Sequence, residues 1–214
     1  MKNMKEGIMQ IANFVYEYLM KTGEKYSDDS WGPRYRWEHT LRVSYWARRL
    51  AIDEGADFEK CVVAALFHDV SHFASEDYRQ HGDKSAEIAK DFLVKQNYSE
   101  DFIEDVAYAV KSHVGESTPR TIEAKILQDA DTLDRFGYFR ILLFGKTADI
   151  SDLGKLKEKV KSSLDYLKKL EMGEFGAIWT KIGKAKLKGL LEVNRATLAG
   201  LLEELENTKP PLIG

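Results

Sequence analysis

The sequence predicts an all-α fold, and three features support that prediction. Apolar residues recur at steps of three and four along nearly every long segment, which is the period of an amphipathic helix. Alternation of apolar and polar residues, the pattern of a half-buried strand, is scarce. The run from Cys61 to Phe67 is apolar at every position, which predicts a helix that is buried on all sides and crosses the centre of the domain.

Capping residues and breaks divide the amino-terminal part into three predicted helices. The first passes through Ile8 and ends near Gly23, and the Gly, Ser, Asp and Pro residues within 22–33 predict a loop. The second helix runs from about residue 34 to residue 50. Asp57 is a suitable N-cap for the third helix, which contains the apolar run.

The middle of the chain continues with helices that are separated by polar segments. Residues 71–82 are polar and irregular, which predicts a loop. Helix starts are predicted at Asp83 or Ser85, at Ser99 and at Thr121. The last of these helices can extend to Phe144, because its apolar period continues that far.

The carboxy-terminal part has the pattern of two charged amphipathic helices with a break around residues 173–176. We therefore expect a first domain over residues 1–150 and a helical extension over residues 151–214 that packs on it. A homodimer surface is the alternative role for the apolar faces of this extension.

The composition excludes several classes of protein. The single cysteine excludes a disulfide framework and a Cys-rich zinc site. The net charge of −3 gives no electrostatic case for nucleic-acid binding, and no apolar run approaches the roughly 20 residues of a membrane span. Because no apolar signal segment lies near its start, we expect a cytoplasmic protein with neither a nucleic acid nor a membrane as partner.

Two ionisable residues, His68 and Asp69, directly follow the most apolar run of the chain. A buried and unpaired carboxylate is costly and tends to become neutral. A divalent metal ion would keep Asp69 charged and would take the imidazole of His68 as a further ligand. The alternative is a helix end that emerges into solvent, where a histidine favours the helix dipole and an aspartate meets water.

Two other predicted helices also direct polar groups toward the core. His39 shares an apolar face with Val43 and Leu50, and both Asp129 and Asp131 lie on or beside the buried face of the helix that starts near residue 121. Periodicity does not choose between the two aspartates. The simpler alternatives are a hydrogen-bonded core histidine and a solvated helix edge. Together, the three helices supply two nitrogens and two carboxylates, a mixed set that suits Mn²⁺, Fe²⁺, Zn²⁺ or Co²⁺ with positions open for water.

The order His39, His68-Asp69, Asp131 resembles the H…HD…D signature of the HD-domain metal-dependent phosphohydrolases. The local contexts are similar too, namely Trp37-Glu38-His39-Thr40, Ala65-Leu66-Phe67-His68-Asp69-Val70 and Gln128-Asp129-Ala130-Asp131-Thr132-Leu133-Asp134. The resemblance covers about residues 34–145 and implies an HD-domain-like helical bundle there. The carboxy-terminal helical extension is expected from its amphipathic pattern and not from the resemblance. It also implies that Asp131, which precedes a short polar residue and Leu, is the metal ligand, with Asp129 as a supporting or alternative group.

Two further histidines, His81 and His113, match a subset of the same family through the segments His81-Gly82, Ser85-Ala86 and Lys111-Ser112-His113. In family members with two ions, histidines from such segments bind the second ion. The alternatives are a loop histidine, a histidine at a helix end and a contact with substrate phosphate. The expected cofactor is one divalent ion or two, and the sequence does not distinguish among Mn, Fe, Zn, Co, Ni and Mg.

Candidate catalytic and phosphate-binding residues lie near these ligands. The catalytic candidates are His72, Asp77 and Asp129, which could position the attacking water or protonate the leaving oxygen. Some HD nucleotidases have an acidic residue near the place of His72, so their substrate preference does not transfer directly. The phosphate-binding candidates are Arg42, Lys84 and Arg135, because each is a cation close in sequence to a predicted ligand. A solvent-facing side chain is the alternative for each.

The function that these residues and the resemblance imply is hydrolysis of a phosphate ester or anhydride in a small molecule, which we expect to be a nucleotide. A metal-bound water would be the nucleophile. Two alternatives belong to other classes. One is a di-iron oxygenase resembling myo-inositol oxygenase, and the other is a non-catalytic module that binds metal or nucleotide for regulation.

Overall fold

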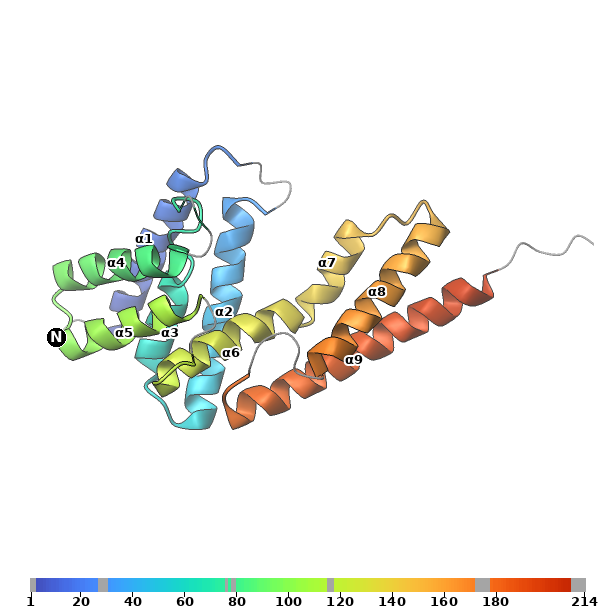
Figure 1. Ribbon diagram of the computed structural model, residues 1–214. Helices are drawn as coiled ribbons and strands as arrows, with labels where there is room; N and C mark the ends of the chain where they lie inside the picture. Colours follow the sequence, from blue (N-terminus) through green and yellow to red (C-terminus); the bar gives the residue numbers. More distant parts are fainter. Residues whose placement is uncertain are drawn as a thin grey trace, which may run out of the picture. The chain divides into compact units, whose positions relative to one another are not determined.

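The computed structural model describes residues 3–26, 31–75, 77, 80–114, 118–171 and 178–208, and its regular elements are α-helices (Figure 1). In chain order they are α1 (Met4–Thr22), α2 (Pro33–Glu54), α3 (Phe58–Phe67), α4 (His81–Lys95), α5 (Glu100–Ser112), α6 (Ile122–Phe136), α7 (Phe139–Thr147), α8 (Leu153–Glu171) and α9 (Lys181–Asn207). No strand occurs among the described residues, which confirms the all-α prediction. Within the same ranges, no helix combines the length and the apolar character that crossing a membrane requires.

Several helix ends lie where the sequence predicts them. The side chains of Asp57 and Ser99 accept hydrogen bonds from backbone N–H groups in the first turns of α3 and α5. Gly55 ends α2 in the left-handed conformation with φ of 72°, which favours glycine. α2 thus extends a few residues past Leu50, the last apolar residue of the predicted helix, and ends before Gly55 as the sequence predicts.

The start of α4 differs from the prediction. α4 begins at His81, ahead of the predicted starts at Asp83 and Ser85, so His81 belongs to the first turn of a helix and not to a loop. This first turn of α4 lies close to the end of α5. A Cβ atom at Gly82 would lie 2.9 Å from the carbonyl oxygen of Lys111, so only glycine fits at this contact without a shift.

The predicted helix that could reach Phe144 is in fact two helices. α6 ends at Phe136, and α7 begins at Phe139 after Gly137, a residue type with low helix propensity. The carbonyl oxygen of Phe136 accepts a hydrogen bond of 2.9 Å from the buried Asn194 Nδ2, which satisfies an acceptor that a helix end leaves open. The break predicted around 173–176 lies outside the described residues.

The structure divides into two compact units. Unit 1 comprises Met1–Asp134 and Ile178–Gly183, and unit 2 comprises Arg135–Ala177 and Lys184–Gly214. The division therefore follows Asp134, whereas the sequence led us to expect a boundary near residue 150.

The core of unit 1 is built around α3. Every residue from Cys61 to Phe67 is buried, and α3 contacts α1, α2, α4 and α5. This packing agrees with the prediction that the apolar run crosses the centre of the domain. The carboxy-terminal end of α3 delivers His68 and Asp69 into the interior, where their side chains are almost fully buried.

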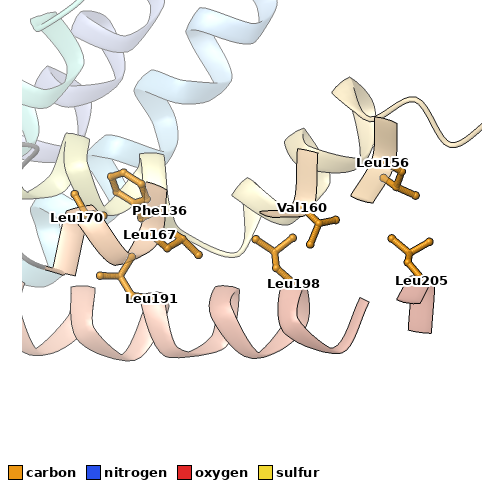
Figure 2. Packing of buried hydrophobic residues seen from close by; sticks show 8 residues of the cluster. All are labelled: Phe136, Leu156, Val160, Leu167, Leu170, Leu191, Leu198 and Leu205. Atoms are coloured by element: carbon orange, nitrogen blue, oxygen red, sulfur yellow. The ribbon is translucent and has the colours of Figure 1, made fainter. Parts of the chain in front are cut away.

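Unit 2 has a hydrophobic core of its own, in which the apolar faces of α8 and α9 meet (Figure 2). Its buried members are Phe136, Leu156, Val160, Leu167, Leu170, Leu191, Leu198 and Leu205. Amphipathic helices of this kind bury one apolar face, and here each helix supplies the surface that covers the other.

Candidate metal centre

A cluster of buried histidines and aspartates lies in unit 1 where several helices end or begin. α2 supplies His39, the end of α3 supplies His68 and Asp69, the first turn of α4 supplies His81, and the residue after α5 is His113. His68 and His81 are each only 1% exposed, and Asp69 is 4% exposed. Groups of this kind are rarely buried together unless they are paired or coordinate a metal ion.

The first group of donor atoms comes from His39, His68 and Asp69, and all of these atoms lie within 4.8 Å of one another. The Nε2 atoms of His39 and His68 are 3.3 Å apart, and Asp69 Oδ2 is 3.3 Å from His68 Nε2. Asp131 borders this group, with its Oδ1 atom 3.3 Å from His39 Nε2. Of the two aspartates between which the period of α6 did not choose, the structure places Asp131 beside His39.

The second group of donor atoms comes from Asp69, His81 and His113. Asp69 Oδ1 lies 2.9 Å from His81 Nε2 and 3.6 Å from His113 Nε2, and the two Nε2 atoms are 3.1 Å apart. Asp69 therefore serves both groups, with Oδ2 toward the first and Oδ1 toward the second. This arrangement could hold two ions that share one carboxylate.

The hydrogen bonds behind the histidines select their tautomers. His68 Nδ1 donates to the carbonyl oxygen of Ala65 at 2.7 Å, and His113 Nδ1 donates to that of Val110 at 2.5 Å. A carbonyl oxygen can only accept, so each Nδ1 carries the proton and each neutral ring has its lone pair on Nε2.

His39 is held in a related way by a carboxylate. Its Nδ1 atom donates to Asp134 Oδ2 at 2.8 Å, which leaves Nε2 to face His68 and Asp131. A carboxylate behind a histidine is a common support for a metal ligand, because it fixes the ring and increases its basicity.

The donor set fits a divalent metal ion. The Nε2 atoms of His81 and His113 lie 3.1 Å apart, and because His113 Nε2 carries a lone pair, a proton or a cation must lie between the two atoms for the contact to be favourable. Two ligand atoms that bind the same ion, each at a distance of about 2.1 Å, lie about 3.0–3.4 Å from one another when the angle at the ion is octahedral or tetrahedral. The separations within both groups fall in or close to this range.

The electrostatics of the cluster favour a cation. Burial opposes the charge of His39, but hydrogen bonds to Asp131 and Asp134 and the charge of Asp69 outweigh it and raise the pKa of His39 to about 9. Burial also opposes the charge of Asp69, yet the neighbouring His68 and Arg36 hold the pKa of this carboxyl well below its usual range. The Asp69 carboxylate thus stays ionised and attracts positive charge to the centre.

Two residues at this centre were not among the candidates from the sequence. Arg36 Nη1 lies 2.5 Å from Asp69 Oδ2, and Arg36 Nη2 lies 3.1 Å from His72 Nε2. Asp134 supports His39, as described above. Helical spacing offers a signal for both, since Arg36 precedes His39 by one turn and Asp134 follows Asp131 by one turn, but it does not specify which groups their side chains contact.

The predicted phosphate-binding cations take different places. Arg42 Nε lies 2.6 Å from Asp134 Oδ1, so this guanidinium supports the carboxylate that holds His39. Lys84 is exposed and donates from Nζ to the carbonyl oxygen of Ala74 at 2.5 Å. Arg135 is also exposed and lies in unit 2. A contact of any of these three with substrate remains a prediction.

The predicted catalytic residues also differ in their surroundings. His72 is half-buried beside Arg36, and burial together with the Arg36 charge lowers the pKa of His72 to about 4. Asp77 is exposed. The Asp129 carboxylate accepts backbone hydrogen bonds from Trp179 at 2.7 Å and Thr180 at 2.8 Å, which is a structural contact within unit 1. The catalytic roles expected for these residues remain predictions.

Comparison with known families agrees with the geometry of the centre. Residues 36–135 match the model of the HD domain family. This part of the chain therefore forms an HD domain, as the order of its histidines and aspartates indicates. This range includes every member of the two donor groups as well as Asp131 and Asp134.

Curated relatives and solved structures with similarity to the chain include three informative examples. Ribonuclease Y of Clostridium perfringens (strain SM101 / Type A) is 29% identical over 175 residues, which make up 79% of this chain but only 32% of that protein. The chain thus spans about a third of the length of this relative. An HD superfamily hydrolase from an uncultured Thermotogales bacterium has a TM-score of 0.65 at 23% identity, over 90% of this chain and 91% of its own. YpgQ of Bacillus subtilis in complex with ADP has a TM-score of 0.57 at 19% identity, over 99% of both chains. The two structural likenesses show that the fold is shared.

Proposed function

We propose that the protein is a metal-dependent phosphohydrolase that cleaves a phosphate ester or anhydride. The observation that carries this proposal is the pair of donor groups that share Asp69, with the Nε2 atoms of four histidines directed toward that carboxylate. A divalent ion bound there would lower the pKa of a bound water and polarise a phosphoryl oxygen. The ligands would be His39, His68, Asp69 and Asp131 for one ion, and Asp69, His81 and His113 for a second.

The chain's own residues supply the remaining requirements of such a reaction. Arg36 is a fixed cation beside Asp69 and is suited to the negative charge of a phosphoryl group. Because the lowered pKa keeps His72 neutral at neutral pH, its Nε2 atom can accept a hydrogen bond from Arg36. We therefore infer that His72 orients Arg36 and does not act as the proton donor to the leaving group.

The substrate that we propose is a nucleotide. The structurally similar YpgQ has been seen in complex with ADP, which contains both a phosphate ester and an anhydride. The similarity to ribonuclease Y makes an RNA phosphodiester the substrate to compare with it. The net charge of −3 favours the small molecule over the polymer, because a nucleic-acid partner usually meets a basic surface.

Phosphate release from nucleoside mono-, di- and triphosphates and cleavage of a short RNA test this proposal, with each of Mn²⁺, Fe²⁺, Co²⁺, Ni²⁺, Zn²⁺ and Mg²⁺. We expect hydrolysis of a nucleotide by the wild type and a loss of about 100-fold or more in His68→Ala and Asp69→Ala, together with a loss of bound metal. Lys90→Ala, at an exposed surface ion pair, is the matched control and should retain activity.

Three outcomes would contradict the proposal. Unchanged metal content in both ligand variants would exclude the metal centre. RNA cleavage without nucleotide hydrolysis would contradict the nucleotide as substrate and would make an RNA phosphodiester the substrate. Absence of hydrolysis with every metal would exclude the reaction, and anaerobic iron loading followed by an optical spectrum would then test the di-iron oxygenase alternative.

A further inference from the structure

Trp179 is connected to the predicted second-ion ligand His113 by a short chain of hydrogen bonds within unit 1. Trp179 Nε1 donates to Gln128 Oε1 at 2.8 Å. The same Gln128 side chain donates from Nε2 to the carbonyl oxygen of Ser112 at 2.5 Å. Ser112 is the last residue of α5, and His113 follows it directly. Gln128 thus joins α6 to the peptide that carries His113.

His113 needs such support because it lies at the end of a helix. The last carbonyls of a helix have no partner inside the helix, so the final turn frays unless other groups hold it. The backbone bond from His113 N to Val110 O is long, at 3.4 Å. Gln128 supplies a donor to the adjacent Ser112 carbonyl and so restrains the main chain at the point from which the His113 ring extends.

The Trp179 end of this chain of bonds is itself firmly attached. Asp129 accepts hydrogen bonds from the backbone N–H groups of Trp179 and Thr180, and Glu54 Oε1 accepts one from Ile182 N at 2.7 Å. A Cβ atom at Gly183 would lie only 2.4 Å from Asp129 Oδ2, which shows how closely this segment approaches α6. The backbone of the Trp179 segment is therefore held by side chains of α2 and α6 that are not themselves predicted metal ligands.

We propose that Gln128 and Trp179 are positioning residues for the second metal ion, acting through the end of α5. The inference rests on the two-ion centre of the proposed function. A ligand that is already ordered loses little freedom when the ion binds, whereas a frayed ligand must be ordered at the expense of affinity. Removal of the Gln128 or Trp179 hydrogen bonds should therefore weaken the binding of the second ion and leave the affinity for the first ion unchanged.

Binding of Mn²⁺ alone to the metal-free full chain measures this effect. Calorimetric titration gives a dissociation constant for each ion, and the electron paramagnetic resonance spectrum distinguishes a coupled Mn²⁺ pair from a single Mn²⁺. In Gln128→Leu and Trp179→Phe we expect the second ion to bind about 10-fold more weakly, while the first dissociation constant is unchanged. The coupled spectrum should then appear only at higher Mn²⁺ concentration.

Arg195→Ala is the matched control, because it removes an exposed ion pair to Glu171 within unit 2 and leaves the hydrogen bonds of Gln128 and Trp179 intact. The second ion should bind to this variant as it does to the wild type. If this variant loses as much second-ion affinity as the two test variants do, the proposal is overturned, because the loss then reflects a general loosening of the fold. Two ions in the wild type with unchanged second-ion affinity in both test variants would overturn this inference alone. Fewer than two ions in the wild type would overturn the two-ion centre as well. Trp179→Phe keeps an aromatic ring, so it tests the inference even where Gln128→Leu does not fold.

Discussion

Asp69 and His39 show how single residues make the centre receptive to a cation. Asp69 is enclosed by histidine nitrogens and by the Arg36 guanidinium, so its charge persists despite burial. His39 faces two carboxylates and the neighbouring Asp69, which makes its protonated form stable in the metal-free protein. A proton and a metal ion therefore compete for the same Nε2 atom of His39.

This competition predicts a pH dependence of stability for the metal-free protein. The folded-state pKa of His39, about 9, lies above its ordinary value of 6.5. Its stabilising contribution is therefore fully present below pH 6.5 and is lost as the pH rises to about 9, with an upper bound of about 3 kcal/mol. Urea unfolding in the presence of a chelator across this interval measures the change.

His39→Gln is the control for that measurement, and it should lack this part of the pH dependence. Metal affinity should show the opposite trend and increase over the same interval, because deprotonation frees the ligand atom. A free energy of unfolding that falls equally in the wild type and in His39→Gln would contradict the assignment to His39.

At the scale of single elements, α3 determines where the centre can form. Its buried run fixes the direction in which the chain leaves the helix, and the next two residues are the predicted ligands His68 and Asp69. Phe67 is fully buried and packs against Phe14 and Phe92, with ring centroids 6.2 Å and 5.8 Å away. Packing at the end of α3 thus supports the ligands directly.

Phe67→Ala should therefore lower the stability of the metal-free protein. Loss of the ring leaves a cavity beside His68, and we expect the free energy of unfolding to fall by about 3–5 kcal/mol. Ile52→Ala, at an apolar position that is 58% exposed, should change it by about 0.5 kcal/mol or less. Denaturant unfolding of the metal-free proteins measures both effects, and similar losses in the two variants would contradict this account of α3.

At the scale of the whole molecule, the centre joins helices that are far apart in the sequence. The donor atoms come from α2, from the end of α3, from α4 and from the end of α5. Bound metal would therefore link four elements of unit 1. It would stabilise the folded chain in proportion to its affinity, because the unfolded chain does not assemble the site.

Metal removal should consequently lower the stability of the whole protein. At a free-metal concentration 100 times the dissociation constant, one bound ion contributes about 2.7 kcal/mol. Thermal unfolding with Mn²⁺ and with excess chelator measures the difference. The unfolding temperature of His68→Ala should change little on addition of Mn²⁺. An increase as large as that of the wild type would show that the stabilising ion binds at another site.

The sequence by itself determined the all-α class, the buried position of α3, the N-caps at Asp57 and Ser99, and the ordered set of candidate ligands. These features are local, since they follow from periodicity, capping chemistry and the spacing of a motif along the chain. Only the tertiary structure decided that His81 belongs to a helix. It also decided between the two aspartates of α6, since Asp129 holds the segment at Trp179 whereas Asp131 lies beside His39. Finally, it placed Arg36 and Asp134 next to the predicted ligands. Such choices depend on which helix faces meet, and the spacing of residues within one helix does not specify its neighbours.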